Sequence, residues 1–156
     1  MNKLIWPLMS LMLALGAHAN AADEPPRRAR IEPGMRAPDR MNVRAAFKSA
    51  ARSLVKKASC QALFQDLQLN GLQALGHVRY QQAQTARELA LCGGGVAAAT
   101  GVGLSQVLIC RRFHTLPPHQ RTVVLIHEAL HTAGLDEVPY DPNGLTSRQI
   151  TDCLLY

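Results

Sequence analysis

Residues 122–133 read TVVLIHEALHTA, and the fold must be organised around this stretch. Its side chains are apolar apart from two threonines and three functional residues, His127, Glu128 and His131. A segment that is apolar on nearly all sides predicts a buried helix. Histidines four positions apart lie on one face of such a helix, and Glu128 lies about 100° further around its axis. The sequence therefore predicts a buried helix that presents two adjacent imidazoles and a neighbouring carboxylate.

The H-E-x-x-H spacing predicts a zinc site in which Glu128 acts as general base. Catalytic zinc takes three protein ligands and keeps one position for water. His127 and His131 are the first two ligands, and Glu137 is the favoured third. The metal would also supply partners for polar groups that are costly to bury alone. The alternatives for the third ligand are Asp136, Asp141 and Asp152.

The run from His127 to Glu137, HEALHTAGLDE, resembles the metzincin pattern H-E-x-x-H-x-x-G-x-x-H. Gly134 permits the left-handed turn that brings the chain back toward a metal. Two features depart from that family. Its last ligand is His or Asp where this chain has Glu137, and its methionine turn has no counterpart because no methionine follows Met41. The resemblance is therefore to zincin-type peptidases in general, with a metzincin-like ligand turn.

Roughly the last fifty residues are also similar to small exported bacterial proteins. Those proteins carry a strand ending in cysteine, then HEALHTxGLxE, then a short Ser/Thr-Arg-x-Ile helix. The matching segments here are 107–110, 127–137 and 146–151. The resemblance implies a small α+β zincin-like domain, mainly helical, with a short antiparallel sheet and a buried H-E-x-x-H helix.

The resemblance also implies a zinc metalloendopeptidase that hydrolyses peptide bonds with a zinc-activated water. Tyr140 and Arg148 are candidate donors to the oxyanion of this reaction. In zincins a sheet-edge strand above the metal helix pairs with the extended substrate, and the strand near 107–110 is expected to do so here. The alternative is a zinc-binding envelope protein without turnover. The two functions differ at Glu128, which only hydrolysis requires.

The N-terminus reads as a secretory signal peptide, residues 1–19. One lysine precedes an apolar run at 4–17, and small residues favour cleavage after Ala19 or after Ala21. A membrane anchor is disfavoured because the run is shorter than the ~20 residues that span a bilayer and contains Pro7. We expect a secreted or periplasmic protein with no membrane span after cleavage.

Residues 20–40 form a basic, proline-rich leader, and one domain follows at 41–156. Without Lys3, 16 basic residues remain against 11 acidic ones, a net charge of +5. This mild excess lacks the clustered basic stripe of a nucleic-acid binder, so the expected partner is a peptide or protein substrate. Autoinhibition by the leader is disfavoured because it contains no cysteine that could cap a zinc ion.

Four cysteines in an exported chain predict two disulfides. Of the three pairings, Cys60–Cys92 with Cys110–Cys153 is favoured. A structural zinc site is the alternative, and it is disfavoured because no C-x-x-C pair is present.

Hydrophobic periodicity and turn residues predict the other elements. The helix with the motif is expected to be capped by Thr115 and ended by Gly134, and Thr146 is expected to cap a last helix. His77, His114 and His119 are interpreted as surface or loop residues, and Asp66 and Glu88 as solvated charges. Further helices are expected at 43–58, 62–69, 85–91 and 147–155, and strands at 77–80 and 105–110.

Overall fold

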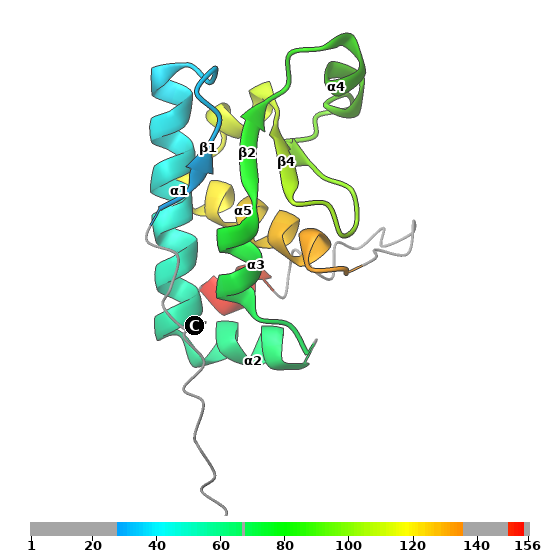
Figure 1. Cartoon of the computed structure of the whole chain (residues 1–156). Helices are drawn as coiled ribbons and strands as arrows, with labels where there is room; N and C mark the ends of the chain where they lie inside the picture. The colour runs from blue at the N-terminus through cyan, green and yellow to red at the C-terminus, as the bar shows by residue number, and fades with distance from the viewer. Residues whose placement is uncertain (1–27, 67, 136–149, 155–156) are drawn as a thin grey trace, which may run out of the picture.

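The computed structural model describes residues 28–66, 68–135 and 150–154. Helices dominate, and four short strands form one sheet, which confirms the predicted small α+β domain (Figure 1). The elements in chain order are β1 (Arg30–Ile31), α1 (Ala37–Lys56), α2 (Ala58–Asp66), α3 (Gly71–His77), β2 (Arg79–Gln82), α4 (Ala86–Leu91), β3 (Ala98–Ala99), β4 (Gln106–Ile109), the 3₁₀ helix η1 (Arg111–Thr115) and α5 (Pro118–Thr132). Residues 150–154 are also helical.

The sheet is mixed, with strand order β1-β2-β4-β3. β1 and β4 run parallel to β2, and Tyr80 lies opposite Val107. β3 alone is antiparallel, with Ala99 opposite Leu108 of β4. The predicted antiparallel sheet is therefore correct only for the β3–β4 pair. The other pairs are parallel because helices intervene along the chain, α1 to α3 between β1 and β2 and α4 between β2 and β4, and parallel neighbours need such crossovers.

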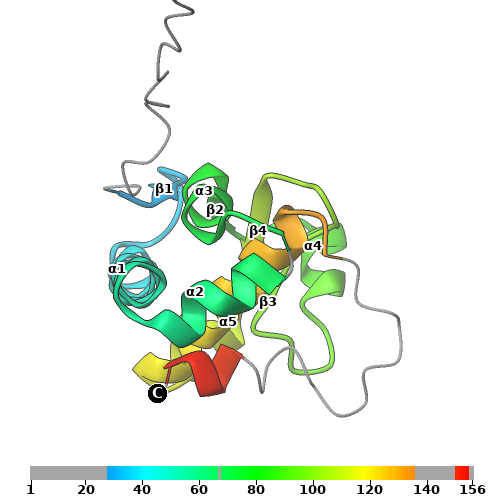
Figure 2. The same ribbon diagram turned by 90° about the horizontal axis from the view of Figure 1, so that it is seen from below.

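The hydrophobic core lies between the sheet and the two longest helices. α1 and α5 pack against each other, with α5 passing behind the sheet in Figure 1; Figure 2 shows both helices from below. The helix predicted at 43–58 is confirmed as α1, and it begins earlier, at Ala37, with Pro38 in its first turn. The ring of Phe47 meets Tyr80 of β2 edge to face, with ring centroids 6.3 Å apart. The buried stripe of α1 includes Val43, Ala46, Phe47, Ala50 and Leu54.

The second half of the predicted leader belongs to the domain. β1 adds a strand beside β2, and the N–H of Glu32 donates to the carbonyl of Tyr80 at 3.0 Å. Met35 is 2% exposed and joins the core. A segment rich in proline and charge is fixed here by main-chain pairing that its composition does not reveal. The signal peptide and residues 20–27 lie outside the described residues.

The two predicted disulfides are present, but the predicted pairing is wrong. Cys60 is bonded to Cys153, with Cα atoms 4.6 Å apart, and Cys92 to Cys110, with Cα atoms 5.5 Å apart. Cys92 follows α4 directly and Cys110 follows β4, so the second bond joins two neighbouring element ends. The pairing depends on how α2 and the C-terminal helix meet in space, which cysteine spacing does not encode.

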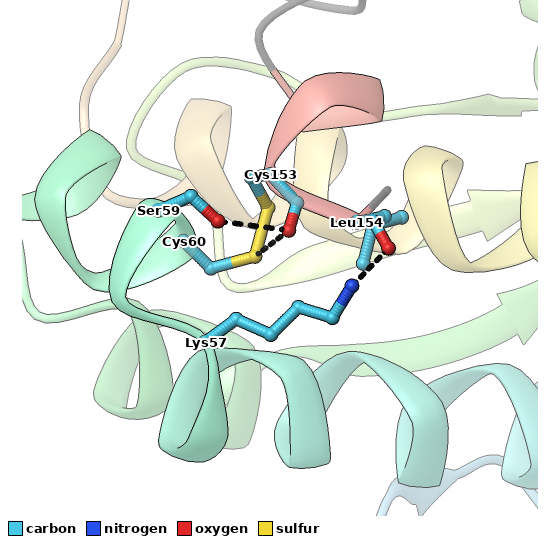
Figure 3. Close-up of a disulfide and its surroundings, with 5 residues drawn as sticks. All are labelled: Lys57, Ser59, Cys60, Cys153 and Leu154. Carbon is cyan, nitrogen blue, oxygen red and sulfur yellow. Dashed lines mark hydrogen bonds between the residues drawn. A yellow bond between two sulfur atoms is a disulfide. The ribbon is translucent and has the colours of Figure 1, made fainter. Parts of the chain in front are cut away.

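Side chains at the start of α2 reinforce the first disulfide (Figure 3). The hydroxyl of Ser59 donates to the carbonyl of Cys153 at 3.2 Å, and the Lys57 ammonium donates to the carbonyl of Leu154. These carbonyls lie in the last turn of helical residues 150–154, where helix hydrogen bonding leaves acceptors unused. Helical residues 150–154 are thereby fixed to the junction of α1 and α2.

Several predicted elements occur with shifted ends. The strand predicted at 105–110 is β4, and the one predicted at 77–80 is β2, displaced by two residues. The helix predicted at 62–69 is α2, which ends at Asp66, and the side chain of Asn70 accepts from the N–H of Gln73 and so caps α3. Thr146, the predicted cap of the last helix, and the side chain of Asp66 lie outside the described residues. Within the described residues, no helix is both long and apolar enough to cross a membrane.

Candidate functional site

The H-E-x-x-H motif lies in the second half of α5, as predicted. α5 begins at Pro118 with Pro117 at the N-cap position, so the predicted cap Thr115 does not cap it; the Thr115 hydroxyl donates to the carbonyl of Arg112 within η1 at 2.8 Å. From Arg121 to Thr132 every residue of α5 is buried or half-buried. Such burial explains why this segment tolerates so few charged residues. The face toward the core carries Thr122, Leu125, Ile126, Ala129 and Leu130.

The imidazoles of His127 and His131 lie together at the half-buried edge of α5. Their Nε2 atoms are 3.0 Å apart, and the ring centroids are 4.7 Å apart with the planes at 79°. Two nitrogen ligands each about 2.0–2.1 Å from a tetrahedral zinc lie roughly 3.3–3.4 Å apart. The observed pair therefore presents two donor atoms at nearly the separation that zinc requires.

The chain that follows α5 orients one of these rings. Gly134 has φ of 106°, in the left-handed region, as predicted from its place after the motif. The N–H of Leu135 donates to the carbonyl of Leu130, and the N–H of Gly134 to that of His131, both at 3.0 Å. These are the two hydrogen bonds of a Schellman motif. The turn brings the Leu135 carbonyl to 2.8 Å from the Nδ1 of His131.

A carbonyl oxygen can only accept a hydrogen bond, so the Nδ1 of His131 is the donor to Leu135. The neutral ring then presents the lone pair of Nε2 toward His127. Metal-binding histidines are oriented in this way by an acceptor at their other nitrogen. The sequence predicted that Gly134 permits a left-handed turn after the motif. The structure adds that this turn also fixes the tautomer of His131.

Glu128 is 6% exposed and lies closer to the core than the two histidines. Its negative charge acts on Tyr80 of β2, whose side chain is fully buried. Burial raises the pKa of the Tyr80 hydroxyl, and the negative charge of Glu128 raises it further. Tyr80 was not singled out from the sequence, because only the tertiary structure places it in the same core as the buried residues of α5. A divalent cation beside the histidines would stabilise the Glu128 carboxylate.

Among the described residues, no third candidate metal ligand joins the two histidines. Neither Asp152, which is exposed, nor any other described His, Cys, Asp or Glu completes a group of three that could hold a metal. The remaining predicted site residues lie outside the described residues: Glu137, Asp136, Asp141, Tyr140 and Arg148.

The edge of the sheet nearest the motif is β3, not the predicted strand at 107–110. β4 is an inner strand, paired with both β2 and β3. The connection from β3 to β4 reaches the C-terminal end of α5 (Figure 1), where the N–H of Gly103 donates to the carbonyl of His131 at 2.9 Å. Two alanines give β3 no strong strand signal, so sequence reasoning missed it.

His77 and His119 are exposed, as predicted, but His114 is not a surface residue. The Nδ1 of His114 lies 3.4 Å from a carboxylate oxygen of buried Asp39, whose other oxygen accepts from Arg36 at 2.7 Å. Desolvation lowers the pKa of His114 despite this carboxylate. The pair lies at the N-terminal end of α1, away from the motif, and fastens η1 to that helix.

Glu88 is not simply a solvated charge. Its carboxylate accepts from the N–H groups of Gln84 and Thr85, each at 2.9 Å, and from the amide of Gln81. These hydrogen bonds lower the pKa of Glu88, and the one from the Thr85 N–H has the largest effect. They complete a capping box at the start of α4 and leave Glu88 with a structural role.

No protein-family model matches the chain, and the searches of curated proteins and of solved structures found no significant similarity.

Proposed function

We propose that this protein is an exported zinc-dependent peptidase of the zincin type. One observation carries the proposal: the Nε2 atoms of His127 and His131 lie 3.0 Å apart on α5, with His131 held in the metal-binding tautomer by the Leu135 carbonyl. The buried Glu128 between them supplies a carboxylate within the same helical turn. Histidines that only pack on the surface of a helix require neither the close approach of two Nε2 atoms nor a fixed tautomer.

In this proposal His127 and His131 bind the zinc ion, and Glu137 completes the ligand set. When bound, zinc polarises the scissile carbonyl and makes water a nucleophile near neutral pH. Glu128 accepts a proton from the attacking water and delivers it to the leaving amine as the C–N bond breaks. The oxyanion requires a hydrogen-bond donor, for which Tyr140 and Arg148 are the proposed residues.

The antiparallel edge strand β3 supports a peptide as substrate. Within the described residues β3 pairs on one side only, so its other side offers main-chain groups to an extended chain. The hydrogen bond from Gly103 to the His131 carbonyl connects the β3–β4 hairpin to α5. A peptide added to β3 would therefore run beside the helix that carries the proposed metal ligands.

The two disulfides support an exported protein. Disulfides persist in oxidising compartments and are rare in the cytosol. All four cysteines of the chain are paired in the structure. We propose that residues 1–19 direct export to the periplasm or the exterior and are then removed.

The deciding experiment is elemental analysis of the purified mature protein beside His127→Ala and His119→Ala. His119 is an exposed histidine in the first turn of the same helix, so it is a matched control. We expect about one zinc per chain in the wild type and in His119→Ala, and none in His127→Ala. Because 3.0 Å also suits a hydrogen bond between the two rings, a folded wild type that takes up no zinc would overturn the proposal.

Glu128→Gln separates a peptidase from the alternative zinc-binding envelope protein. This change keeps the size of the side chain and removes its basicity. We expect full zinc content with hydrolysis of a peptide panel reduced by a factor of about 100 or more. Zinc binding by a wild type that cleaves no peptide would instead favour the envelope protein.

A further inference from the structure

A cavity of about 390 Å³ lies on the face of the sheet opposite the core. α4 forms one wall, and the β3–β4 hairpin forms the other. The volume is within the range of small-ligand pockets, about 300–1,000 Å³. Its aliphatic wall consists of Leu91, Ala99, Leu104 and Leu108.

The alternation of side chains along the two strands places this cavity on the outer face. Val107 and Ile109 belong to the core cluster, whereas Gln106 and Leu108 of the same strand line the cavity. In β3, Ala98 belongs to the core, and Ala99 lines the cavity. Successive residues of a strand point to opposite faces. A peptide paired with β3 must follow the same alternation.

We propose that this cavity is a specificity pocket, which receives an apolar side chain of an extended peptide bound along β3. The proposal rests on the peptidase function given above and names a feature of its substrate. Residues of the peptide on the inner face would lie toward α5. A neighbouring residue of the peptide, whose side chain lies on the outer face beside Ala99, would enter the cavity.

Besides its four aliphatic residues the cavity lining includes the exposed Arg87, and the polar groups of Glu88 and Thr100 are already hydrogen-bonded, so the aliphatic wall favours an apolar side chain. The cavity's carboxylate, Glu88, is already hydrogen-bonded to two backbone N–H groups and to Gln81. The hydroxyl of Thr100 donates to the carbonyl of Gln106 at 2.5 Å. Leu91 and Leu104 are 57% and 58% exposed at the rim. Burying them against an apolar side chain would stabilise the complex by removing both surfaces from water.

The rim is attached to the motif helix. A Cβ at Gly101 would lie 2.7 Å from the Cδ1 of Leu104, so the glycine allows Leu104 to lie over the hairpin. Gly103, with φ of 71°, makes the turn whose N–H reaches the carbonyl of His131. The pocket and the proposed metal ligands therefore belong to one connected unit.

Replacement of the exposed rim leucines tests the pocket without disturbing the core. Leu91→Lys and Leu104→Lys are compared with Leu89→Lys, a matched control on α4 that is 54% exposed and does not line the cavity. A peptide library reports kcat/KM for each residue type at each position around the cleaved bond. At one position we expect the rim variants to lose about tenfold or more of the preference for Leu, Met or Phe over Ala, whereas Leu89→Lys keeps it.

Crosslinking of the zinc-loaded Glu128→Gln protein tests the pocket apart from hydrolysis. Extended peptides with a photoreactive leucine analogue at successive positions should mark α4 or the β3–β4 hairpin from one position only. Leu104→Lys should remove that mark. Cleavage by the wild type with unaltered preference in both rim variants would overturn the pocket and leave the peptidase standing. Crosslinking at the cavity without cleavage would support the pocket and overturn the peptidase. If neither cleavage nor crosslinking at the cavity occurred, the pocket and the peptidase would both be overturned.

Discussion

The Nδ1 nitrogen of His131 donates a hydrogen bond of 2.8 Å to the backbone carbonyl of Leu135, four residues further along the chain. One short turn thus ends α5 and fixes a ring nitrogen of the motif. This arrangement depends on Gly134, which alone in the turn has a positive φ. The geometry of the proposed metal site is therefore coupled to the end of a helix.

Gly134→Ala should reduce both stability and metal affinity. A side chain in the left-handed region costs about 1–2 kcal/mol, and loss of the Leu135 acceptor should weaken zinc binding about tenfold or more. Urea unfolding and zinc titration measure the two effects. Gly94→Ala is the control, because Gly94 also has a positive φ, 65°, and lies outside the motif. An equal loss of affinity in both variants would contradict the role of the turn.

The two disulfides should contribute unequally to stability. Cys60–Cys153 closes a separation of 93 residues and Cys92–Cys110 one of 18. Chain-entropy estimates give about 4–5 kcal/mol for the first and about 3 kcal/mol for the second. We expect Cys60→Ala/Cys153→Ala to lower the free energy of unfolding more than Cys92→Ala/Cys110→Ala does. Peptide mapping of the oxidised protein checks the pairing itself, and recovery of a Cys60–Cys92 peptide would contradict it.

The burial of His114 should make the domain less stable in mild acid. Its pKa in the fold is below the ordinary 6.5 because of desolvation, so between these values the unfolded chain binds more protons. The stability that neutral His114 contributes is complete above pH 6.5 and is lost as the pH falls through the lowered pKa. Urea midpoints from pH 7.5 to 5 should fall less steeply in His114→Gln than in the wild type. Exposed His119 provides the control, since His119→Gln should leave the slope unchanged.

Thr85→Ala should destabilise α4 through its capping box. The Thr85 hydroxyl accepts from the N–H of Glu88 at 3.2 Å, and the Glu88 carboxylate accepts in return at 2.9 Å. Loss of such a cap costs about 1 kcal/mol. Thr115→Ala is the informative comparison, because Thr115 resembles a cap in the sequence but does not cap α5. Denaturant unfolding should show the larger loss for Thr85→Ala, and the reverse order would contradict this assignment.

The sequence predicted the features that depend on neighbouring residues. The apolar run of 122–133 identified α5, the stripe that includes Val43 and Phe47 identified α1, and Gly134 identified the left-handed turn. Helical periodicity and glycine conformation act over a few residues, so a single chain reveals them. The proximity of His127 and His131 follows from the same periodicity.

The sequence did not predict features that depend on contacts between distant segments. It gave the wrong disulfide pairs, assigned the sheet edge to 107–110 instead of β3, and treated His114 as a surface residue. Each of these depends on which elements meet after the chain has folded. Short strands such as Ala98–Ala99 also carry almost no propensity signal.

By itself, then, the sequence determined a buried helix with two adjacent imidazoles, a carboxylate beside them and a turn after them, because all four lie within about two turns of helix. Only the tertiary structure decided that Cys60 meets Cys153, that β3 is an edge strand among the described residues, and that a cavity opens between α4 and the hairpin. The physical reason is that local hydrogen bonding and periodicity fix a helix, whereas sheet order, disulfide pairing and cavities arise from the packing of the whole chain.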